Sequence, residues 1–303
     1  MSEQGEIFEP IPQNVSAGTE HVTCILGART RYWEYGKLDG TPLVLVHGFR
    51  GDHHGLELIT HYLAQFRVIV PDLPGFGKSD ALPGIQHHLS TYAAWLDEFL
   101  HHVVKQETIY LVGHSFGSIV CSYFAANRPE RIRRLALINP ISQPALEGNQ
   151  KVLSRLADLY YSAGEKLPAP LGFSLLRSSI VTMLSSKFMA KNKDKKLQRY
   201  IDGQHHAYFG NFTSRRALLE AYRTSVSETA ARYAPSILIP TLMIVAEKDD
   251  LGTLETQHSM AQSIPHCTLK IIPRVGHLIH YETPRRAAHL ISDFFEGNSC
   301  DYS

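Results

Sequence analysis

A five-residue motif, Gly113 to Gly117, reads Gly-His-Ser-Phe-Gly and constrains this chain more than any other feature. The residues before it, 108–112, are β-branched and apolar and predict a buried strand, while residues 118–127 predict a helix that ends before Pro129. A serine between a strand and a helix lies on a sharp turn, which the flanking glycines permit because a side chain there would collide with neighbouring backbone. The motif therefore predicts that the Ser115 hydroxyl is exposed at the start of a helix, where it can act as a nucleophile.

Strand and helix signals alternate along the chain from residue 43 to residue 140. Such alternation requires β-α-β crossovers and parallel strands with helices on both faces. We expect helices in this part at residues 55–65, 89–104 and 115–127, after a hairpin at residues 21–36. The chain thus predicts an α/β fold with a mostly parallel, doubly wound sheet of about eight strands.

The alternation stops between Pro140 and Pro240, and strand signals resume after Pro240. The intervening residues show helical periodicity, which predicts a helical insertion into the α/β core. The expected helices of the insertion span residues 151–165, 171–190, 195–203 and 215–233. We therefore divide the chain into a first core part, residues 1–140, a helical lid, residues 141–239, and a second core part, residues 240–303.

A serine hydroxyl is a weak nucleophile near neutral pH and needs a general base that is oriented by an acid. Candidates for both follow predicted strands in the second core part. One strand opens into a polar turn with Asp249 and Asp250, and the next leads to His277 and His280. Because ligands bind outside the carboxyl ends of parallel strands, we expect an aspartate and a histidine from these loops near Ser115. From the residues alone, either aspartate can instead cap a helix, and either histidine can be the base.

The order Ser, Asp, His, together with two loop motifs, resembles the α/β-hydrolase fold enzymes, in the branch that carries a helical lid. The motifs are Gly276-His277 before the last helix and residues 47–51, His-Gly-Phe-Arg-Gly, after a short buried strand. The resemblance implies that Ser115 is the nucleophile and His277 the base. It places the acid at Asp249, because the family's acid commonly follows a small residue at the strand end by three positions.

The resemblance also implies an oxyanion hole made of two backbone amides. In the family, one N–H comes from the residue after His-Gly and the other from the residue after the nucleophile. The matching amides are those of Phe49 and Phe116. Loss of one such donor typically lowers the rate by about 10²–10³.

Four side chains near these motifs and in the insertion are candidates for substrate contact: His47, Arg50, His114 and Tyr208. Arg50 is the most specific to this chain. A guanidinium binds a carboxylate or phosphate through two parallel hydrogen bonds, so Arg50 can recognise an anionic substrate group. The alternative is that Arg50 is a surface or capping residue.

The predicted helix at residues 171–190 carries an apolar stripe and is followed by a basic run, residues 191–196. The stripe consists of Phe173, Leu176, Ile180, Met183, Leu184 and Phe188. One interpretation is a lid helix packed over the core, with a solvated charged end. The other is a peripheral membrane contact that lets the enzyme take lipid substrates from a membrane surface.

Composition argues against several other classes of protein. A net charge of +1 and a pI of about 7.8 give no case for nucleic acid as a partner. The run Gly77-Lys78-Ser79 is not a phosphate loop, because Asp72 stands where that loop requires glycine. Several of the 17 histidines occur as adjacent pairs, which face different directions on a helix and chelate poorly. We therefore expect no metal and no cofactor.

The cellular location is predicted from the N-terminus and the cysteines. Residues 1–15 lack the apolar segment of a secretory signal, and no apolar run reaches the roughly 18 residues of a spanning helix. The cysteines are Cys24, Cys121, Cys267 and Cys300. The first three fall in predicted elements and are expected to be buried thiols, which favours a reducing, cytoplasmic location. The sequence gives no prediction of the oligomeric state.

These features predict a serine hydrolase that cleaves a small-molecule ester or lipid. The aromatic content of the insertion favours an apolar acyl group. Other reactions of the same residues stay open, namely hydrolysis of a carbon–carbon bond in a ring-cleavage product, hydrolysis of a thioester or amide, and acyl transfer. The non-enzyme alternative is a catalytically silent, ligand-binding relative.

Overall fold

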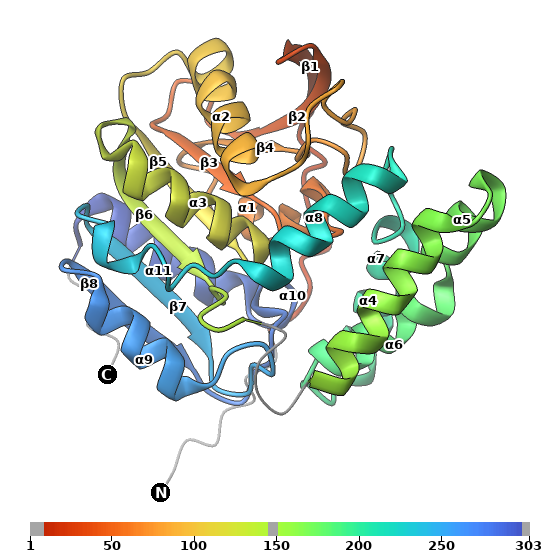
Figure 1. Ribbon diagram of the computed structural model, residues 1–303. Helices are drawn as coiled ribbons and strands as arrows, with labels where there is room; N and C mark the ends of the chain where they lie inside the picture. Colours follow the sequence, from red (N-terminus) through yellow and green to blue (C-terminus); the bar gives the residue numbers. More distant parts are fainter. Residues whose placement is uncertain (1–8, 145–150, 299–303) are drawn as a thin grey trace, which may run out of the picture.

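The computed structural model describes residues 9–144 and 151–298, and a sheet of eight strands forms the centre of this part (Figure 1). The strands are β1 (Thr19–Ile25), β2 (Ala28–Gly36), β3 (Pro42–Val46), β4 (Arg67–Pro71), β5 (Ile109–His114), β6 (Ile132–Ile138), β7 (Thr241–Ala246) and β8 (Cys267–Ile272). Their order is β1-β2-β4-β3-β5-β6-β7-β8. β2 pairs antiparallel with β1 and β4, and all later pairs are parallel. The predicted mostly parallel sheet is therefore confirmed.

Helices connect the strands and form the insertion. They are α1 (Glu57–His61), α2 (Leu89–Phe99), α3 (Phe116–Asn127), α4 (Lys151–Lys166), α5 (Ala169–Leu176), α6 (Ser179–Met189), α7 (Lys195–Tyr208), α8 (Arg215–Ser227), α9 (Leu254–Ser263), α10 (Ile279–Glu282) and α11 (Pro284–Glu296). Short helical turns are η1 (His53–Leu56), η2 (Leu100–Val104), η3 (Pro129–Arg131) and η4 (Ala234–Ser236). The helix predicted at residues 89–104 is α2 followed by the π-helical turn η2.

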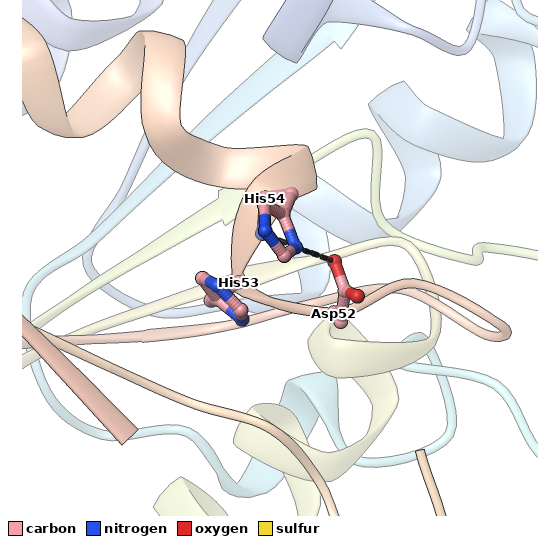
Figure 2. A group of neighbouring side chains, drawn as sticks. All are labelled: Asp52, His53 and His54. Carbon is pink, nitrogen blue, oxygen red and sulfur yellow. Dashed lines mark hydrogen bonds and ion pairs between the residues drawn. The ribbon is translucent and has the colours of Figure 1, made fainter. Parts of the chain in front are cut away.

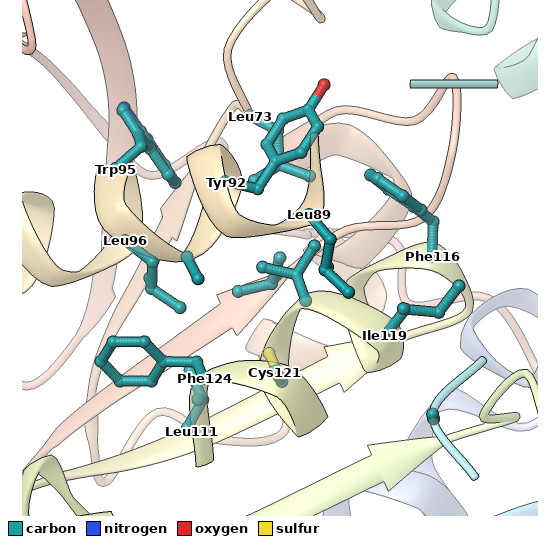
Figure 3. Packing of buried hydrophobic residues seen from close by; sticks show 14 of the residues in the cluster. Leu73, Leu89, Tyr92, Trp95, Leu96, Leu111, Phe116, Ile119, Cys121 and Phe124 are labelled. Atoms are coloured by element: carbon teal, nitrogen blue, oxygen red, sulfur yellow. The ribbon is translucent and has the colours of Figure 1, made fainter. Parts of the chain in front are cut away.

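Helices cover both faces of the sheet, as a doubly wound fold requires. Along β3, Val44 and Val46 belong to the core that includes α2, α3 and α9, whereas Leu43 and Leu45 belong to the core that includes α1 and α11. Figure 3 shows the first of these cores, with side chains of α2 packed against those of α3. Full burial of one such side chain stabilises the fold by about 1.5–3 kcal/mol. Because both faces of the sheet are packed, the sheet is a rigid scaffold for the loops at its edge.

The strand order reverses at β3, which lies between β4 and β5. Such a switch point leaves a crevice at the carboxyl ends of the strands, where ligands bind in α/β folds. Val46 at the end of β3 pairs with Gly113 of β5, and Ala246 at the end of β7 pairs with Ile272 of β8. The register therefore brings the loops after β3, β5, β7 and β8 to one edge.

Helices α4 to α8 form the insertion, and α4 to α7 stand apart from the sheet in Figure 1 while α8 crosses back toward it. The single helix predicted at residues 171–190 is wrong, because the chain turns at Ser178 between α5 and α6. Leu176 is buried, and Phe173 stacks on Phe212, so the predicted stripe is not one exposed face. Its members Ile180, Leu184 and Phe188 lie outside the described side chains.

The cysteines differ in exposure. Cys121 is buried and Cys267 is partly buried, but Cys24 is exposed, so its predicted burial is wrong. The reason is that β1 is the edge strand and one of its faces is open to solvent. Cys300 lies outside the described residues. Within the described part of the chain, no helix combines the length and apolar character needed to cross a membrane.

Candidate active site

Ser115 lies on the turn between β5 and α3 with a φ of 52°, a left-handed conformation that is uncommon for residues other than glycine. A Cβ atom at Gly113 would lie 2.6 Å from the Gly117 carbonyl oxygen. A Cβ atom at Gly117 would lie 2.3 Å from the Val46 carbonyl oxygen. Both contacts are too short for a real Cβ, so the turn requires both glycines and presents Ser115 as the motif predicts.

His277 connects Ser115 to Asp249. The Nε2 atom of His277 lies 2.8 Å from Ser115 Oγ, and its Nδ1 atom lies 2.9 and 3.0 Å from the two carboxylate oxygens of Asp249. Asp249 also accepts a hydrogen bond from the Leu251 N–H at 2.9 Å, which fixes its carboxylate. Because Nδ1 faces a carboxylate, it carries the ring proton, and Nε2 is left to accept the serine proton.

The other predicted candidates have different surroundings. Asp250 forms an ion pair with Lys191, which lies between α6 and α7. His280 is buried in α10, and its ring centroid lies 4.2 Å from that of His114. The structure therefore brings Asp249 and His277 to Ser115, rather than Asp250 and His280.

Phe49 and Phe116, the predicted oxyanion-hole residues, belong to two segments next to Ser115. Phe116 is the first residue of α3, and the first N–H groups of a helix have no acceptor within that helix. The loop that carries Phe49 approaches closely, since a Cβ atom at Gly48 would lie 3.2 Å from the Cβ of Ser115. The loop that carries Phe49 and the start of α3 thus both lie beside Ser115.

His47 holds the Phe49 loop in place. Its Nε2 atom accepts a hydrogen bond from the Leu73 N–H at 2.9 Å, so the proton is on Nδ1, which donates to the Gly48 carbonyl at 2.8 Å. Burial lowers the pKa of His47 and keeps the ring neutral. Both ring nitrogens bond to backbone, so His47 positions this loop, and the residue also lines the cavity described below.

Arg50 is 2% exposed, so the predicted surface position is wrong and the capping alternative fits. Its Nη2 atom donates to the Leu176 carbonyl at 2.6 Å, and its Nε atom donates to the Phe209 carbonyl at 3.2 Å. Leu176 ends α5 and Phe209 follows α7, and a cation is favourable at helix C-termini, where carbonyls lack partners. A third contact, at 3.4 Å, joins Nη1 to the Tyr161 hydroxyl. Arg50 thus ties the Phe49 loop to the insertion.

All four predicted contact residues, His47, Arg50, His114 and Tyr208, line the cavity described below. Burial and the neighbouring His277 lower the pKa of His114 to about 3. Tyr208 stacks on His54 with ring centroids 3.6 Å apart.

A cavity of about 1050 Å³ opens between the carboxyl edge of the sheet and the insertion, and Ser115, His277 and Asp249 line it. Two groups of ring side chains form part of its lining. The aromatic wall consists of Phe49, Phe116, Tyr161 and Tyr222, whose rings contact one another. The histidine wall consists of His114, His205, His280 and Tyr281, whose rings also form one connected series. The aromatic wall thus begins at the loops that flank Ser115, and the histidine wall begins beside His277.

Comparison with known proteins identifies the family of this chain. A family model described as alpha/beta hydrolase fold matches residues 41–284. The chain belongs to the α/β-hydrolase family. This hydrolase is 25% identical to Lipase 1 of Psychrobacter immobilis, over 85% of this chain and 77% of that protein. It is 27% identical to 2-hydroxymuconate semialdehyde hydrolase of Pseudomonas sp. (strain CF600), over 88% of this chain and 90% of that protein.

Solved structures share the fold. The hydrolase is similar to a thermophilic esterase from Thermogutta terrifontis, with a TM-score of 0.73 and 22% identity, over 92% of this chain and 99% of that one. It is also similar to an enol-lactonase from Burkholderia xenovorans LB400, with a TM-score of 0.75 and 18% identity, over 91% of this chain and all (100%) of that one. Because both identities are below 25%, the similarity shows a shared fold only.

One group of side chains in the described residues has the spacing of metal ligands. The ligand atoms of Asp52, His53 and His54 all lie within 4.8 Å of one another (Figure 2). However, Asp52 Oδ1 lies 3.1 Å from His54 Nδ1, and His53 Nδ1 lies 2.9 Å from an Asp72 carboxylate oxygen. The centroids of the two rings lie 3.8 Å apart with the ring planes tilted by 38°, and the His53 ring also stacks on Trp33. These hydrogen bonds and ring contacts account for the group, and we assign it no metal.

Asn139 is a functional candidate that the sequence analysis missed. It is fully buried after β6, and its Oδ1 atom accepts from the Ala246 N–H at 2.8 Å. Its Nδ2 atom donates to the carbonyls of His277 at 2.8 Å and Gly276 at 3.2 Å. Asn139 therefore couples the strand before Asp249 to the His277 loop. A polar residue directly after a buried strand was the available signal.

Glu282 was also missed, and it connects the His277 loop to the insertion. Its buried carboxylate accepts from the Gly276 N–H at 3.1 Å and from the Asn192 N–H at 2.8 Å. In addition, the His277 N–H donates to the Met189 carbonyl at 3.2 Å. Burial raises the pKa of Glu282, although the backbone donors oppose this shift. The end of α6 and the segment after it thus help to hold His277.

Proposed function

We propose that this hydrolase cleaves carboxylic esters, with Ser115 as nucleophile, His277 as general base and Asp249 as the acid that orients the base. One observation carries the proposal: Ser115 Oγ, the His277 ring and the Asp249 carboxylate form an uninterrupted series of hydrogen bonds beside a large cavity. A base held by a third group is what activates a serine hydroxyl.

In the proposed reaction, Ser115 Oγ attacks the ester carbonyl carbon while His277 Nε2 takes the hydroxyl proton. Asp249 stabilises the resulting imidazolium, and the Phe49 and Phe116 amides donate to the oxyanion. Collapse of the tetrahedral intermediate breaks the bond to the alcohol oxygen, which leaves with the proton from His277. A water that His277 deprotonates then attacks the acyl-enzyme, and release of the acid restores Ser115.

The aromatic wall supports an apolar acyl group. Phe49 and Phe116 belong to the loops beside Ser115, and Tyr161 and Tyr222 extend the wall into the insertion. The cavity of about 1050 Å³ is slightly larger than the roughly 300–1000 Å³ that is typical of small-molecule sites. We therefore propose a medium or long acyl chain.

A second candidate is hydrolysis of a carbon–carbon bond in a ring-cleavage product. Its support is the 27% identity with 2-hydroxymuconate semialdehyde hydrolase over 88% of this chain. In that reaction the nucleophile would attack a ketone carbonyl, and the leaving group would be a carbanion equivalent that requires protonation at carbon. Thioester and amide hydrolysis would use the same three residues.

A chain-length series tests the proposal. Steady-state kcat/KM is measured for p-nitrophenyl esters from acetate to palmitate, with Ser115→Ala as control and a vinylogous diketone acid as the carbon–carbon substrate. We expect ester turnover with an optimum beyond butyrate, and loss of turnover by at least about 10³ in Ser115→Ala. Cleavage of the diketone without ester turnover would replace the proposal by the second candidate.

We also propose that the insertion contacts lipid surfaces. The contact would use exposed leucines that do not belong to the apolar stripe described in the sequence analysis. Leu159 and Leu171 are 65% and 59% exposed on α4 and α5. The double variant Leu159→Ser/Leu171→Ser should lower turnover of vesicle-bound esters by about tenfold and leave p-nitrophenyl acetate unchanged. Leu38, which is 67% exposed on the core, provides the matched control Leu38→Ser. Equal losses on both substrates would contradict the lipid contact.

The proposed location is a reducing compartment, the cytoplasm. Cys24, Cys121 and Cys267 are free thiols, and an exposed thiol such as Cys24 is best preserved under reducing conditions. Fractionation of the source cells tests this, and recovery of the protein mainly from the medium would contradict it.

A further inference from the structure

Glu282 lies between the loop that carries His277 and the insertion, and its carboxylate binds the backbone of both. The residue is fully buried at the end of α10. Its Oε1 atom accepts from the Gly276 N–H at 3.1 Å, and its Oε2 atom accepts from the Asn192 N–H at 2.8 Å. A longer contact, at 3.4 Å, joins Oε1 to the Lys191 N–H. Because a buried charge is costly unless it is hydrogen-bonded, the carboxylate is stable in this place only while both segments supply their donors.

The insertion also contacts the main chain of Gly276 and His277 directly. The His277 N–H donates to the Met189 carbonyl at 3.2 Å. A Cβ atom at Gly276 would lie 2.5 Å from the same carbonyl oxygen and 2.6 Å from Cγ of Lys191, which is too close for a real Cβ. The end of α6 and the residues after it therefore rest on the backbone of the predicted base, and glycine at position 276 permits this close approach.

Further contacts join the same part of the insertion, residues 189–192, which we call the docking segment, to the loops of the site. Lys191 forms an ion pair with Asp250, the residue after the predicted acid. The first two residues of the docking segment pack against an apolar cluster that includes Leu278 and Tyr281, which follow the predicted base. The docking segment thus contacts both the loop of the acid and the loop of the base.

We propose that Glu282 is a positioning residue for His277, which keeps the base in place by fastening its loop to the docking segment. This inference rests on the proposed function, in which His277 is the general base. A base must lie within hydrogen-bond reach of the proton that it takes, and a small displacement lowers the rate strongly. Asn139 supports the His277 loop from the core, and the docking segment supports it from the insertion. Release of the docking segment therefore displaces His277 from Ser115, and catalysis requires that this end of the insertion stays in contact with the core.

Two variants break the connection from opposite sides, and each has a matched control. Glu282→Gln keeps the size of the side chain but replaces one oxygen by an NH₂ group, which cannot accept, so one of the two segments loses its acceptor. Asn192→Pro removes the N–H on the insertion side and leaves Glu282 unchanged. Asn192→Ala is the control for the proline variant, since it keeps that N–H. Glu255→Gln, at an exposed position on α9, is the control for loss of a carboxylate.

Glu282→Gln and Asn192→Pro should each lower kcat for p-nitrophenyl butyrate by about 10–100-fold and leave KM within about twofold of wild type. The rate constant for phosphonylation of Ser115 by a fluorophosphonate should fall by a similar factor, since that reaction also needs the base. The double variant should lose no more than about threefold beyond either single variant, because both changes break the same connection. Both controls should stay within about twofold of wild type.

Several results would overturn the role of Glu282. A loss of kcat in Glu282→Gln with normal activity in Asn192→Pro would show that the carboxylate supports the base without the insertion. Losses that multiply in the double variant, or a rise in KM at constant kcat, would also overturn it. Amide hydrogen exchange in the docking segment should be faster in Glu282→Gln, and unchanged exchange there would overturn the proposal even if Asn192→Pro does not fold.

The wild type separates this inference from the proposed function. Absence of both ester turnover and phosphonylation in the wild type would refute the proposed function, and this inference with it. Normal rates in the wild type together with unaffected variants would refute only the role of Glu282.

Discussion

Replacement of Arg50 by methionine should loosen the insertion and lower activity. The guanidinium reaches from the loop before Gly51 into the insertion, where it donates to the carbonyls of Leu176 and Phe209. Methionine retains an apolar stem of similar length but no donor. The substitution therefore removes the hydrogen bonds between the Phe49 loop and the insertion while it preserves much of the packing.

The size of the effect follows from these bonds. A hydrogen bond to a charged group contributes about 1.5–3 kcal/mol, and two of those made by Arg50, at 2.6 and 3.2 Å, are well formed. The Leu176 carbonyl also accepts from the Tyr160 hydroxyl at 3.0 Å, so it keeps a partner in the variant, whereas the Phe209 carbonyl loses the Arg50 donor. Removal of a buried cation also removes its desolvation cost, which offsets part of the loss. We expect a net loss of about 2 kcal/mol in docking of the insertion, or about 30-fold in the docking equilibrium.

Hydrogen–deuterium exchange of α5 and α7, together with kcat/KM for p-nitrophenyl butyrate, measures this effect. Exchange should be faster by up to about 30-fold in Arg50→Met, with a parallel fall in kcat/KM. Arg199→Met is the matched control, because Arg199 is an exposed cation on α7. Unchanged exchange, with a lower kcat/KM only for esters that carry a carboxylate, would refute the docking role and support the substrate-anion role instead.

Three further predictions concern stability and positioning. Burial lowers the pKa of His87 to about 4, so its contribution to stability is complete above its unfolded-state pKa of about 6.5 and is lost as the pH falls toward 4. Urea midpoints should therefore fall less steeply over this window in His87→Gln, and equal slopes would contradict the assignment. Gly117→Ala should lower the thermal midpoint by about 5 °C or more, because its Cβ would lie 2.3 Å from the Val46 carbonyl oxygen, and an unchanged midpoint would show that the turn can relax. Asn139→Ala should lower kcat by about 10–100-fold with little change in KM, since Asn139 holds the His277 loop, and a change confined to KM would argue against this role.

The parts of the site that depend on local chain geometry could be predicted from the sequence. The turn at Ser115 follows from the glycines on either side of it, and the loop after a parallel strand predicts a histidine near Ser115, although the choice of His277 over His280 came from family resemblance. The choice of Asp249 over Asp250 came from family resemblance, since the two residues are adjacent in one polar turn. The structure distinguishes them through contacts, because Asp250 pairs with Lys191.

The parts that the sequence did not predict depend on contacts between distant segments. The hydrogen bond from Arg50 to Leu176 joins residues separated by 126 positions, and that from Asn139 to His277 joins residues separated by 138. No periodicity or local motif encodes such a contact. The break at Ser178 was missed because the apolar spacing in the sequence continues across it.

The nucleophilic role of Ser115 is the claim on which the account depends most directly. Intact-mass spectrometry after treatment with a fluorophosphonate probe, followed by peptide mapping, measures it in wild type, Ser115→Ala and Ser118→Ala. Ser118 is the buried neighbour in α3 and controls for general disturbance of the turn. We predict one phosphonyl adduct on Ser115 in wild type and in Ser118→Ala, and none in Ser115→Ala. An adduct on another residue, or equal labelling of Ser115→Ala, would contradict the account.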